Sequence, residues 1–166
     1  GKSSYMKSVG LSIILAQMGM YVPAKSFTYF PFKKLLTRII GNDNLFKGQS
    51  SFEVELMELR GILSRADKYS LVLGDEVCHG TELPSGLAIV TASLIRLSEL
   101  EAKFIFATHL HQLSSIKYIN EIKTIKNYHF EVTYNENNDE LIYNRRLIPS
   151  SGNARYGLEV ARSMGF

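Results

Sequence analysis

Two adjacent carboxylates follow a short apolar run, and their position would suit phosphate hydrolysis. The run Ser70-Leu71-Val72-Leu73-Gly74 leads directly into Asp75 and Glu76. It predicts a buried parallel strand that delivers both carboxylates to the carboxyl edge of a sheet, where open α/β folds bind ligands. There Asp75 would hold Mg²⁺, directly or through water, and Glu76 would orient and deprotonate the attacking water. Taken alone, the pattern fits a strand with an acidic turn equally well.

The first residues of the chain supply the other half of a nucleotide site. Gly1-Lys2-Ser3-Ser4 fits the end of the phosphate loop G-x-x-x-x-G-K-[ST], in which the lysine reaches the terminal phosphates and the hydroxyl ligates Mg²⁺. Those roles fall to Lys2 and Ser3. So short a match gains weight from its context, because a long apolar helix is expected from Ser3 to about Gly19. The earlier glycines of the loop are absent, so we expect a fragment of a larger protein.

The composition narrows the classes of protein that remain. With 166 residues, of which 45% are hydrophobic, the chain can form one domain with a real core. A net charge of +3 gives no basic stripe, so DNA contacts are expected elsewhere in the parent protein. The single cysteine, Cys78, excludes an internal disulfide and fits an intracellular setting. No apolar run reaches membrane-spanning length, so no membrane partner is expected.

The remaining elements follow from periodicity and turn residues. Lys103–Ala107 is predicted as a second buried strand, and with the helix before it completes a parallel βαβ unit. Turn-rich residues 41–49 separate the first strands from the next helix. The predicted elements are strands at Ser26–Phe30 and Leu35–Ile40, a helix from Ser50 or Ser51 to about Ala66, a helix at Leu83–Leu100, an antiparallel hairpin of Tyr128–Tyr134 and Leu141–Ile148 on the sheet edge, and a helix at Arg155–Met164.

Two further residues could act on a phosphate. His109 follows the second buried strand and is expected at the same edge as Asp75 and Glu76, where it could bond a terminal phosphate or the attacking water. Ser50 lies where a helix begins, and a helix end presents N–H groups and a hydroxyl to an anion. The alternatives are a surface turn histidine and an ordinary capping serine.

These motifs together resemble the ATPase domain of the MutS family of DNA mismatch-repair proteins. The resemblance implies an α/β fold of the P-loop NTPase (ABC-ATPase-like) type, a mostly parallel sheet flanked by helices with an antiparallel edge hairpin. It covers essentially the whole chain, with domain boundaries at 1–166 and truncation at both ends. The matching segments, in the family's order, are GKSSYMKS, GMYVPA, LLTRIIGNDNLFKGQSSFEVELMEL, SLVLGDE, GTE, FATHLHQL and RYGLEVA.

The resemblance implies roles for individual residues in binding ATP and Mg²⁺. Asp75 would support the metal together with Ser3, Glu76 would be the catalytic base, and His109 would sense the γ-phosphate. The residues expected to bind phosphates within one subunit are Gly1, Lys2, Ser3 and Ser4.

The resemblance also implies a dimer in which each nucleotide lies between the phosphate loop of one subunit and the signature segment of the other. Ser50 would contact the phosphate across the interface, and Gly80 and Thr81 would lie in the loop that couples the two sites. Two arginines usual in the family are replaced here, by Gln49 and His79. GDEVCHGTE and FATHLH are similar to a divergent branch in large DNA viruses and some organelles.

The implied function is to drive the nucleotide-dependent switching of a mismatch-recognising DNA clamp. The implied partners are a second MutS-type subunit, in a homodimer or heterodimer, mismatched double-stranded DNA bound through domains outside this fragment, and a downstream repair factor. No membrane is implied.

Three other interpretations are compatible with parts of the sequence. Another ABC-type ATPase, such as a transporter subunit or a chromosome-structuring protein, is disfavoured because transporters carry Leu-Ser-Gly-Gly-Gln where this chain has Lys47-Gly48-Gln49-Ser50-Ser51. A nucleotide-binding switch domain with little turnover is disfavoured by the presence of Glu76 and His109. A zinc site lacks the usual ligand spacing; its ligands would be Cys78, His79, His109 and His111.

Overall fold

The computed structural model describes residues 1–39, 51–78, 81–135 and 140–150. The chain divides into two compact units, one spanning Lys2–Leu110 and the other comprising Gly1 and the residues from His111 onward. The predicted helix at Arg155–Met164 and the predicted turn at 41–49 lie outside the described residues.

The first unit is built on a parallel three-stranded sheet. Its strands run in chain order, β1 (Lys34–Arg38), β2 (Ser70–Asp75) and β3 (Lys103–Ala107), with β2 in the centre. Both pairings are parallel, so all three strands end at one edge. Every residue of β2 is buried, which agrees with the uninterrupted apolar run in the sequence. The predicted strands at 70–76, 103–107 and 35–40 are thereby confirmed.

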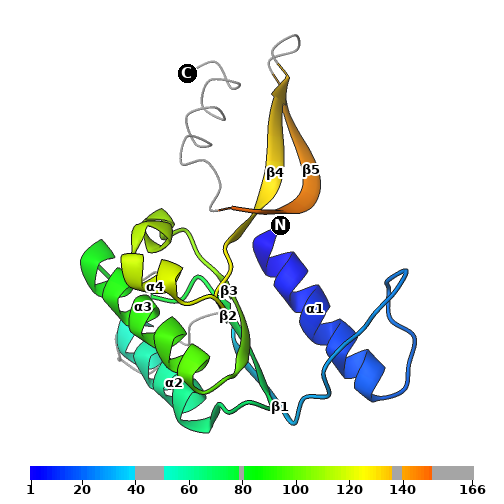
Figure 1. The fold of residues 1–166 in the computed structure, drawn as a ribbon, viewed down its shortest axis with the longest axis horizontal. Coiled ribbons are helices and arrows are strands. Elements are labelled where there is room, and N and C mark those ends of the chain that lie inside the picture. The colour runs from blue at the N-terminus through cyan, green and yellow to red at the C-terminus, as the bar shows by residue number, and fades with distance from the viewer. Residues whose placement is uncertain (40–50, 79–80, 136–139, 151–166) are drawn as a thin grey trace. The chain divides into compact units, whose positions relative to one another are not determined.

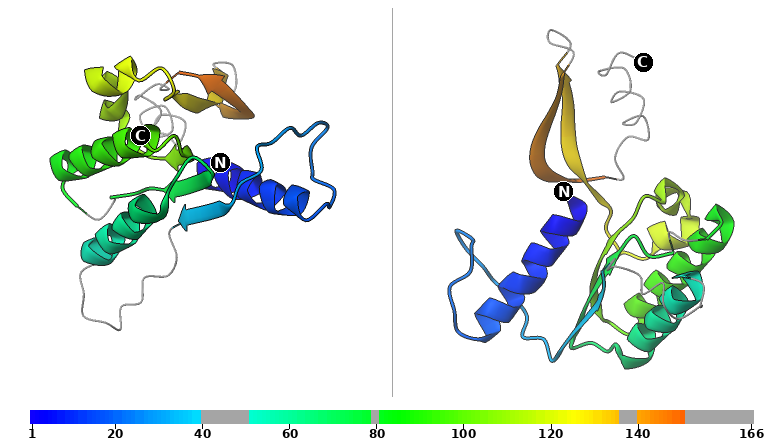
Figure 2. Two further views of the ribbon diagram at one scale, coloured as in Figure 1. Left: turned by 60° about the horizontal axis from the view of Figure 1, so that its bottom comes forward. Right: turned by 180° about the vertical axis from the view of Figure 1, so that it is seen from behind.

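Three helices enclose this sheet, one on one face and two on the other (Figures 1 and 2). Helix α1 (Lys2–Gln17) is followed by Gly19, whose φ of 76° ends the helix in the left-handed conformation that glycine tolerates. Helix α2 (Ser51–Arg65) joins β1 to β2, and α3 (Leu83–Glu99) joins β2 to β3. Pro84 in the first turn of α3 fits a helix start, because its missing N–H has no partner to lose there.

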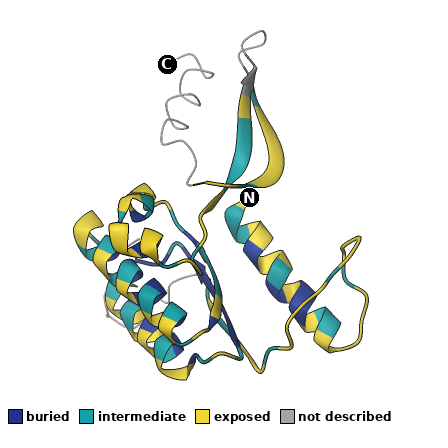
Figure 3. Ribbon diagram, viewed as in Figure 1, coloured by how far each residue is buried: buried dark blue, intermediate teal, exposed yellow. Residues whose placement is uncertain are grey.

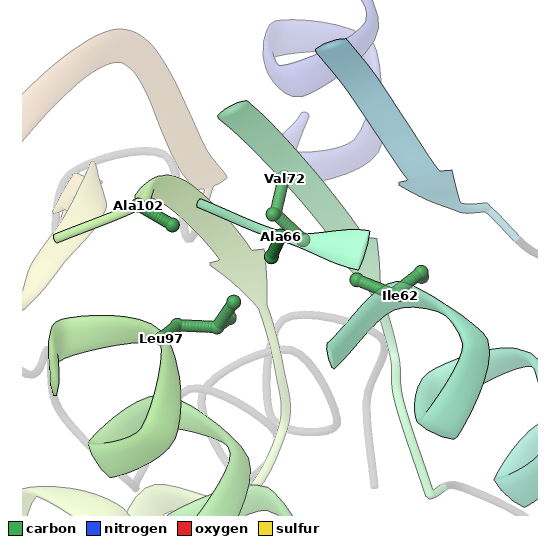
Figure 4. Packing of buried hydrophobic residues seen from close by; sticks show 5 residues of the cluster. All are labelled: Ile62, Ala66, Val72, Leu97 and Ala102. Carbon is green, nitrogen blue, oxygen red and sulfur yellow. The ribbon is translucent and has the colours of Figure 1, made fainter. Parts of the chain in front are cut away.

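The alternation of side chains along β2 divides the core into two clusters. Leu71 and Leu73 face α1, where they pack with Met6 and Ile13. Val72 points to the opposite face and packs against α2 and α3 (Figure 4). Figure 3 shows buried stretches, in dark blue, on α1 and on the helices of the other face. The second cluster consists of Ile62, Ala66, Val72, Leu97 and Ala102.

The strand predicted at Ser26–Phe30 does not form, and this expectation was wrong. The segment forms no ladder, and just after it the Gln17 side chain pairs with the backbone of Phe32. The Gln17 amide donates to the Phe32 carbonyl at 3.1 Å and accepts the Phe32 N–H at 2.7 Å. Phe27 of this segment packs instead against the core cluster that contains Met6 and Leu71. Phe32, just beyond the segment, packs against the same cluster.

The second unit contains an antiparallel hairpin and two short helical turns. Strands β4 (Tyr128–Asn135) and β5 (Glu140–Pro149) pair with a bulge between Phe130 and Val132, so the predicted hairpin is confirmed. Its expected place on the edge of the parallel sheet was wrong, because it forms a sheet of its own and among the described residues neither strand pairs with β1, β2 or β3. The turns η2 (His111–Ser115) and α4 (Lys117–Glu121) were not anticipated. None of the described helices is both long and apolar enough to cross a membrane.

Candidate functional site

The carboxyl edge of the parallel sheet collects the polar residues that the sequence singled out. Asp75 is the last residue of β2 and pairs in register with Ala107, the last residue of β3. Glu76 therefore leaves one strand beside the point where Thr108 and His109 leave the next. The expectation that His109 shares an edge with the two carboxylates is confirmed.

Ser3 and Asp75 form the first hydrogen-bonded pair at this edge. The Ser3 hydroxyl, in the first turn of α1, donates to Asp75 Oδ1 at 2.9 Å, and Asp75 is only 5% exposed. A hydroxyl and a carboxylate oxygen are the hard ligands that Mg²⁺ prefers. Within the described residues no three His, Cys, Asp or Glu side chains cluster as a metal site. A two-oxygen set fits Mg²⁺ well, because this ion keeps several waters and takes further oxygens from phosphates.

Lys2, His109 and Glu76 form a second, continuous hydrogen-bonded chain. Lys2 Nζ donates to the Thr108 carbonyl at 2.9 Å and lies 3.3 Å from His109 Nδ1. His109 Nε2 lies 2.6 Å from Glu76 Oε1. A protonated lysine can only donate, so Nδ1 accepts, and the ring proton on Nε2 is directed to the carboxylate. The imidazole is thus oriented by a cation on one side and an anion on the other.

Two opposing effects act on the pKa of Lys2, and burial is the larger of them. Partial burial lowers the pKa of the Lys2 ammonium, while the negative charges of Glu76 and Asp75 act in the opposite direction. An anion placed against Nζ would favour the charged form further. Lys2 is therefore suited to binding a phosphate, which would replace the neutral acceptors it contacts now.

The backbone at Glu76 adopts an unusual conformation. Its φ of 48° lies in the left-handed region, which costs energy for a residue with a side chain. The Glu76 N–H donates to the Ala107 carbonyl at 2.8 Å, which extends the contact between β2 and β3 by one residue. Strained backbone of this kind is frequent at functional sites, where it aims a side chain.

The other residues expected at the site are not joined to this network. Ser4 is exposed on the first turn of α1, Gly1 is also exposed, and Thr81 is half-buried shortly before α3. Among the described contacts, none links these three to Asp75 or Glu76. Ser50, Gly80, Gln49 and His79 lie outside the described residues, and the last of these belonged to the zinc alternative.

A buried ion pair close to this edge was not predicted from the sequence. Glu55 of α2 is buried and lies 3.9 Å from the guanidinium of Arg38. A signal was present, because Glu55 occupies the apolar stripe of α2. The buried residues of that stripe are Glu55, Leu59, Ile62 and, just past the helix, Ala66.

The fold and the site define the class of protein. A lysine and a hydroxyl at the start of a helix, against an Asp-Glu pair at the end of a central parallel strand, define an ATPase of the P-loop class. Comparison with known families then identifies the kind of ATPase. The chain matches MutS domain V over residues 1–166 and belongs to that family, the ATPase domain of MutS DNA mismatch-repair proteins.

The chain is similar in sequence to proteins from several different organisms. The chain is 52% identical over 98% of its length to a putative DNA mismatch repair protein mutS homolog of Acanthamoeba polyphaga mimivirus, covering 15% of that protein. It is 47% identical over 96% of its length to a mitochondrial mutS homolog of Sarcophyton glaucum, covering 16%. It is 42% identical over 99% of its length to MutS of Clostridium kluyveri, covering 19%. The chain thus spans less than a fifth of each relative. The first two agree with the expected similarity to viral and organellar forms.

Proposed function

We propose that this chain hydrolyses ATP with Mg²⁺ as the nucleotide-driven part of a mismatch-repair protein. The observation that carries the proposal is the meeting of two hydrogen-bonded pairs at one sheet edge, Ser3 with Asp75 and His109 with Glu76. The first pair offers oxygen ligands for Mg²⁺, and the second places a carboxylate beside an oriented imidazole. Lys2 lies at the same edge and supplies positive charge for a phosphate.

The residues would divide the work as follows. Lys2 exchanges the Thr108 carbonyl for a phosphate oxygen when nucleotide binds. Glu76 orients a water and receives its proton, a role for which a carboxylate held by one oxygen leaves the other oxygen to act. His109 keeps Glu76 in place through Nε2, and once Lys2 turns to the phosphate, Nδ1 of His109 can take up a proton and donate to the terminal phosphate. Mg²⁺ bound by Ser3 and Asp75 would offset the negative charge that builds on the phosphates.

The complete site is proposed to need two subunits. Ser50 would contribute to the nucleotide bound by the partner, and Gly80 and Thr81 would carry information between the two sites. This part rests on membership of the MutS domain V family and on the position of α2, which begins at Ser51. Mismatched duplex DNA would be bound by other parts of the protein, and the ATPase cycle would switch that clamp and its contact with a downstream repair factor.

The test is ATP hydrolysis by the protein at its natural length, measured while protein concentration rises. We expect the activity per molecule to climb with concentration, Ser50→Ala to abolish the climb, and Glu76→Gln to abolish hydrolysis while ATP still binds. The matched control is Glu99→Gln, because Glu99 is an exposed glutamate whose one ion pair within the described part of the chain is with Arg96 on the surface of α3. It should leave the rate unchanged.

Three results would contradict the proposal. If Glu76→Gln leaves turnover unchanged, Glu76 is not the base. If activity per molecule stays flat and Ser50→Ala has no effect, the site works within one subunit. Tight ATP binding without turnover in the unaltered protein would favour the nucleotide-binding switch instead.

A further inference from the structure

A buried glutamate outside the predicted site lies one hydrogen bond from the loop that carries Glu76. Glu55 lies near the start of α2 and is 5% exposed. Its Oε1 accepts the backbone N–H of Cys78 at 2.7 Å, in a bond that is buried. An ionised carboxylate is costly to bury unless it is paired and hydrogen-bonded. Its presence in an otherwise apolar stripe therefore indicates a specific task.

The loop after β2 needs to be held in place. Glu76 and Cys78 have φ values of 48° and 63°, both in the left-handed region, and Val77 between them is buried. Two hydrogen bonds fix this loop: the Glu76 N–H donates to Ala107 of β3, and the Cys78 N–H donates to Glu55 of α2. If the second bond is lost, the strained backbone can relax and move the Glu76 carboxylate.

Arg38 supplies the positive charge that a buried Glu55 requires. It is the last residue of β1, its side chain is largely buried, and its Nη2 lies 3.9 Å from Glu55 Oε1. Arg38 Nε also pairs with Glu58 at 2.8 Å, but the Glu58 side chain is half exposed. Together these contacts tie the end of β1, the first part of α2 and the loop after β2 to one another.

We propose that Glu55 is a positioning residue that couples helix α2 to the proposed catalytic base. It holds the Cys78 N–H, and through this bond it fixes the backbone from which Glu76 projects. The inference rests on the proposed role of Glu76.

The test compares Glu55→Ala with Glu58→Ala in the natural-length protein. Glu58 is a matched control, because it shares Arg38 but makes no contact with the loop in the described structure. We expect Glu55→Ala to lower kcat by about tenfold to a hundredfold, as small misplacements of catalytic groups do, with ATP affinity held within about threefold. Glu58→Ala should change neither by more than about twofold. Glu55→Gln keeps an acceptor for the Cys78 N–H and should recover most of kcat.

A second measurement separates loss of position from loss of fold. Alkylation of Cys78 reports the loop directly, since this is the only cysteine in the chain; in the natural-length protein the modified peptide is followed by mass spectrometry. Because the charge of Glu55 itself slows the thiol, the comparison is with Glu55→Gln, which loses the same charge but keeps the acceptor. Labelling should be faster in Glu55→Ala than in Glu55→Gln and should stay slow in Glu58→Ala. If Glu55→Ala does not fold, the Glu55→Gln variant decides the question, through a partial loss of kcat with ATP affinity unchanged; an unchanged kcat in that variant would then overturn the inference.

Three results would overturn the inference. They are an unchanged kcat in Glu55→Ala, an ATP affinity that falls as far as kcat, or a Glu55→Gln variant no better than Glu55→Ala. Glu76→Gln in the same assay separates this failure from that of the proposed function. If Glu76→Gln abolishes hydrolysis and Glu55→Ala does not slow it, only the coupling is wrong. If Glu76→Gln has no effect, the proposed function itself fails.

Discussion

Gly74, in the central strand, has no room for a side chain, and this leads to a quantitative prediction. A Cβ at Gly74 would lie 2.9 to 3.0 Å from three atoms of the Phe106 ring on β3. That ring is held edge-on by Phe104, with their centroids 6.0 Å apart, so it has little freedom to turn away. Overpacking of this kind costs about 1–3 kcal/mol. The lower chain entropy of alanine in the unfolded state returns about 0.4–1 kcal/mol.

We therefore expect Gly74→Ala to weaken the sheet by about 1–2 kcal/mol, taken from these two opposing effects. Amide hydrogen exchange measured by mass spectrometry reports the free energy of opening for β2 without requiring the whole protein to unfold. A loss of this size corresponds to exchange about 5 to 30 times faster in peptides that contain β2.

Gly10→Ala is the matched control on helix α1. A Cβ at Gly10 would approach a single methyl carbon, Leu73 Cδ1, at 2.8 Å, and a side-chain end can shift more easily than a ring. Alanine also gains about 1 kcal/mol over glycine within a helix, so the net change should be small. Replacing Phe106 by leucine should remove most of the cost of Gly74→Ala. The reasoning is refuted if Gly74→Ala exchanges like the unaltered protein, or if its cost persists in the Phe106→Leu background.

Two further predictions concern titrating groups. Burial, reinforced by the nearby negative charge of Glu55, raises the pKa of the Cys78 thiol from 9.0 to about 11, so at pH 8 its thiolate fraction falls about a hundredfold. Iodoacetamide should therefore label Cys78 at least about a hundredfold more slowly in the folded protein than in denaturant. Labelling at the denatured rate would contradict this. The hydrogen bond from Lys34 lowers the pKa of Asp67 in the folded protein. The ionised Asp67 therefore stabilises the fold above its ordinary pKa of 3.8, and this stabilisation is lost as pH falls through the lower pKa of the folded state. Asp67→Asn should therefore melt below the unaltered protein at pH 7 and converge with it near pH 2, and a constant difference in melting temperature would disprove the assignment.

The sequence was sufficient to predict the elements that combine length with a clear pattern. The run before Asp75 is apolar without interruption, and Leu83–Leu100 has both a helical period and a proline in its first turn. Both segments form as predicted. The Ser26–Phe30 segment fails for a non-local reason. Whether an aromatic extended segment becomes a strand depends on which backbone lies beside it, and no sheet strand pairs with it here.

The site was predictable in its location but not in its internal bonds. The parallel βαβ rule places His109 at the same edge as Glu76, but it does not specify that the two side chains meet at 2.6 Å. The Glu55 contact depends on the turn that the chain takes after Glu76, where two residues other than glycine adopt positive φ. Residues other than glycine disfavour positive φ, so the local sequence does not predict this turn. The turn is held by hydrogen bonds to β3 and α2, which the sequence does not reveal.

The strand order has a consequence for how the domain emerges during synthesis. Helix α1 precedes all three strands, so the cover for Leu71 and Leu73 is already present when β2 leaves the ribosome. The opposite face of β2 has only α2 to protect Val72 until α3 follows. Because nascent domains fold from the N-terminus as they appear, the interval between the synthesis of β2 and that of α3 is when this side of the sheet is most exposed to chaperones and to misassociation.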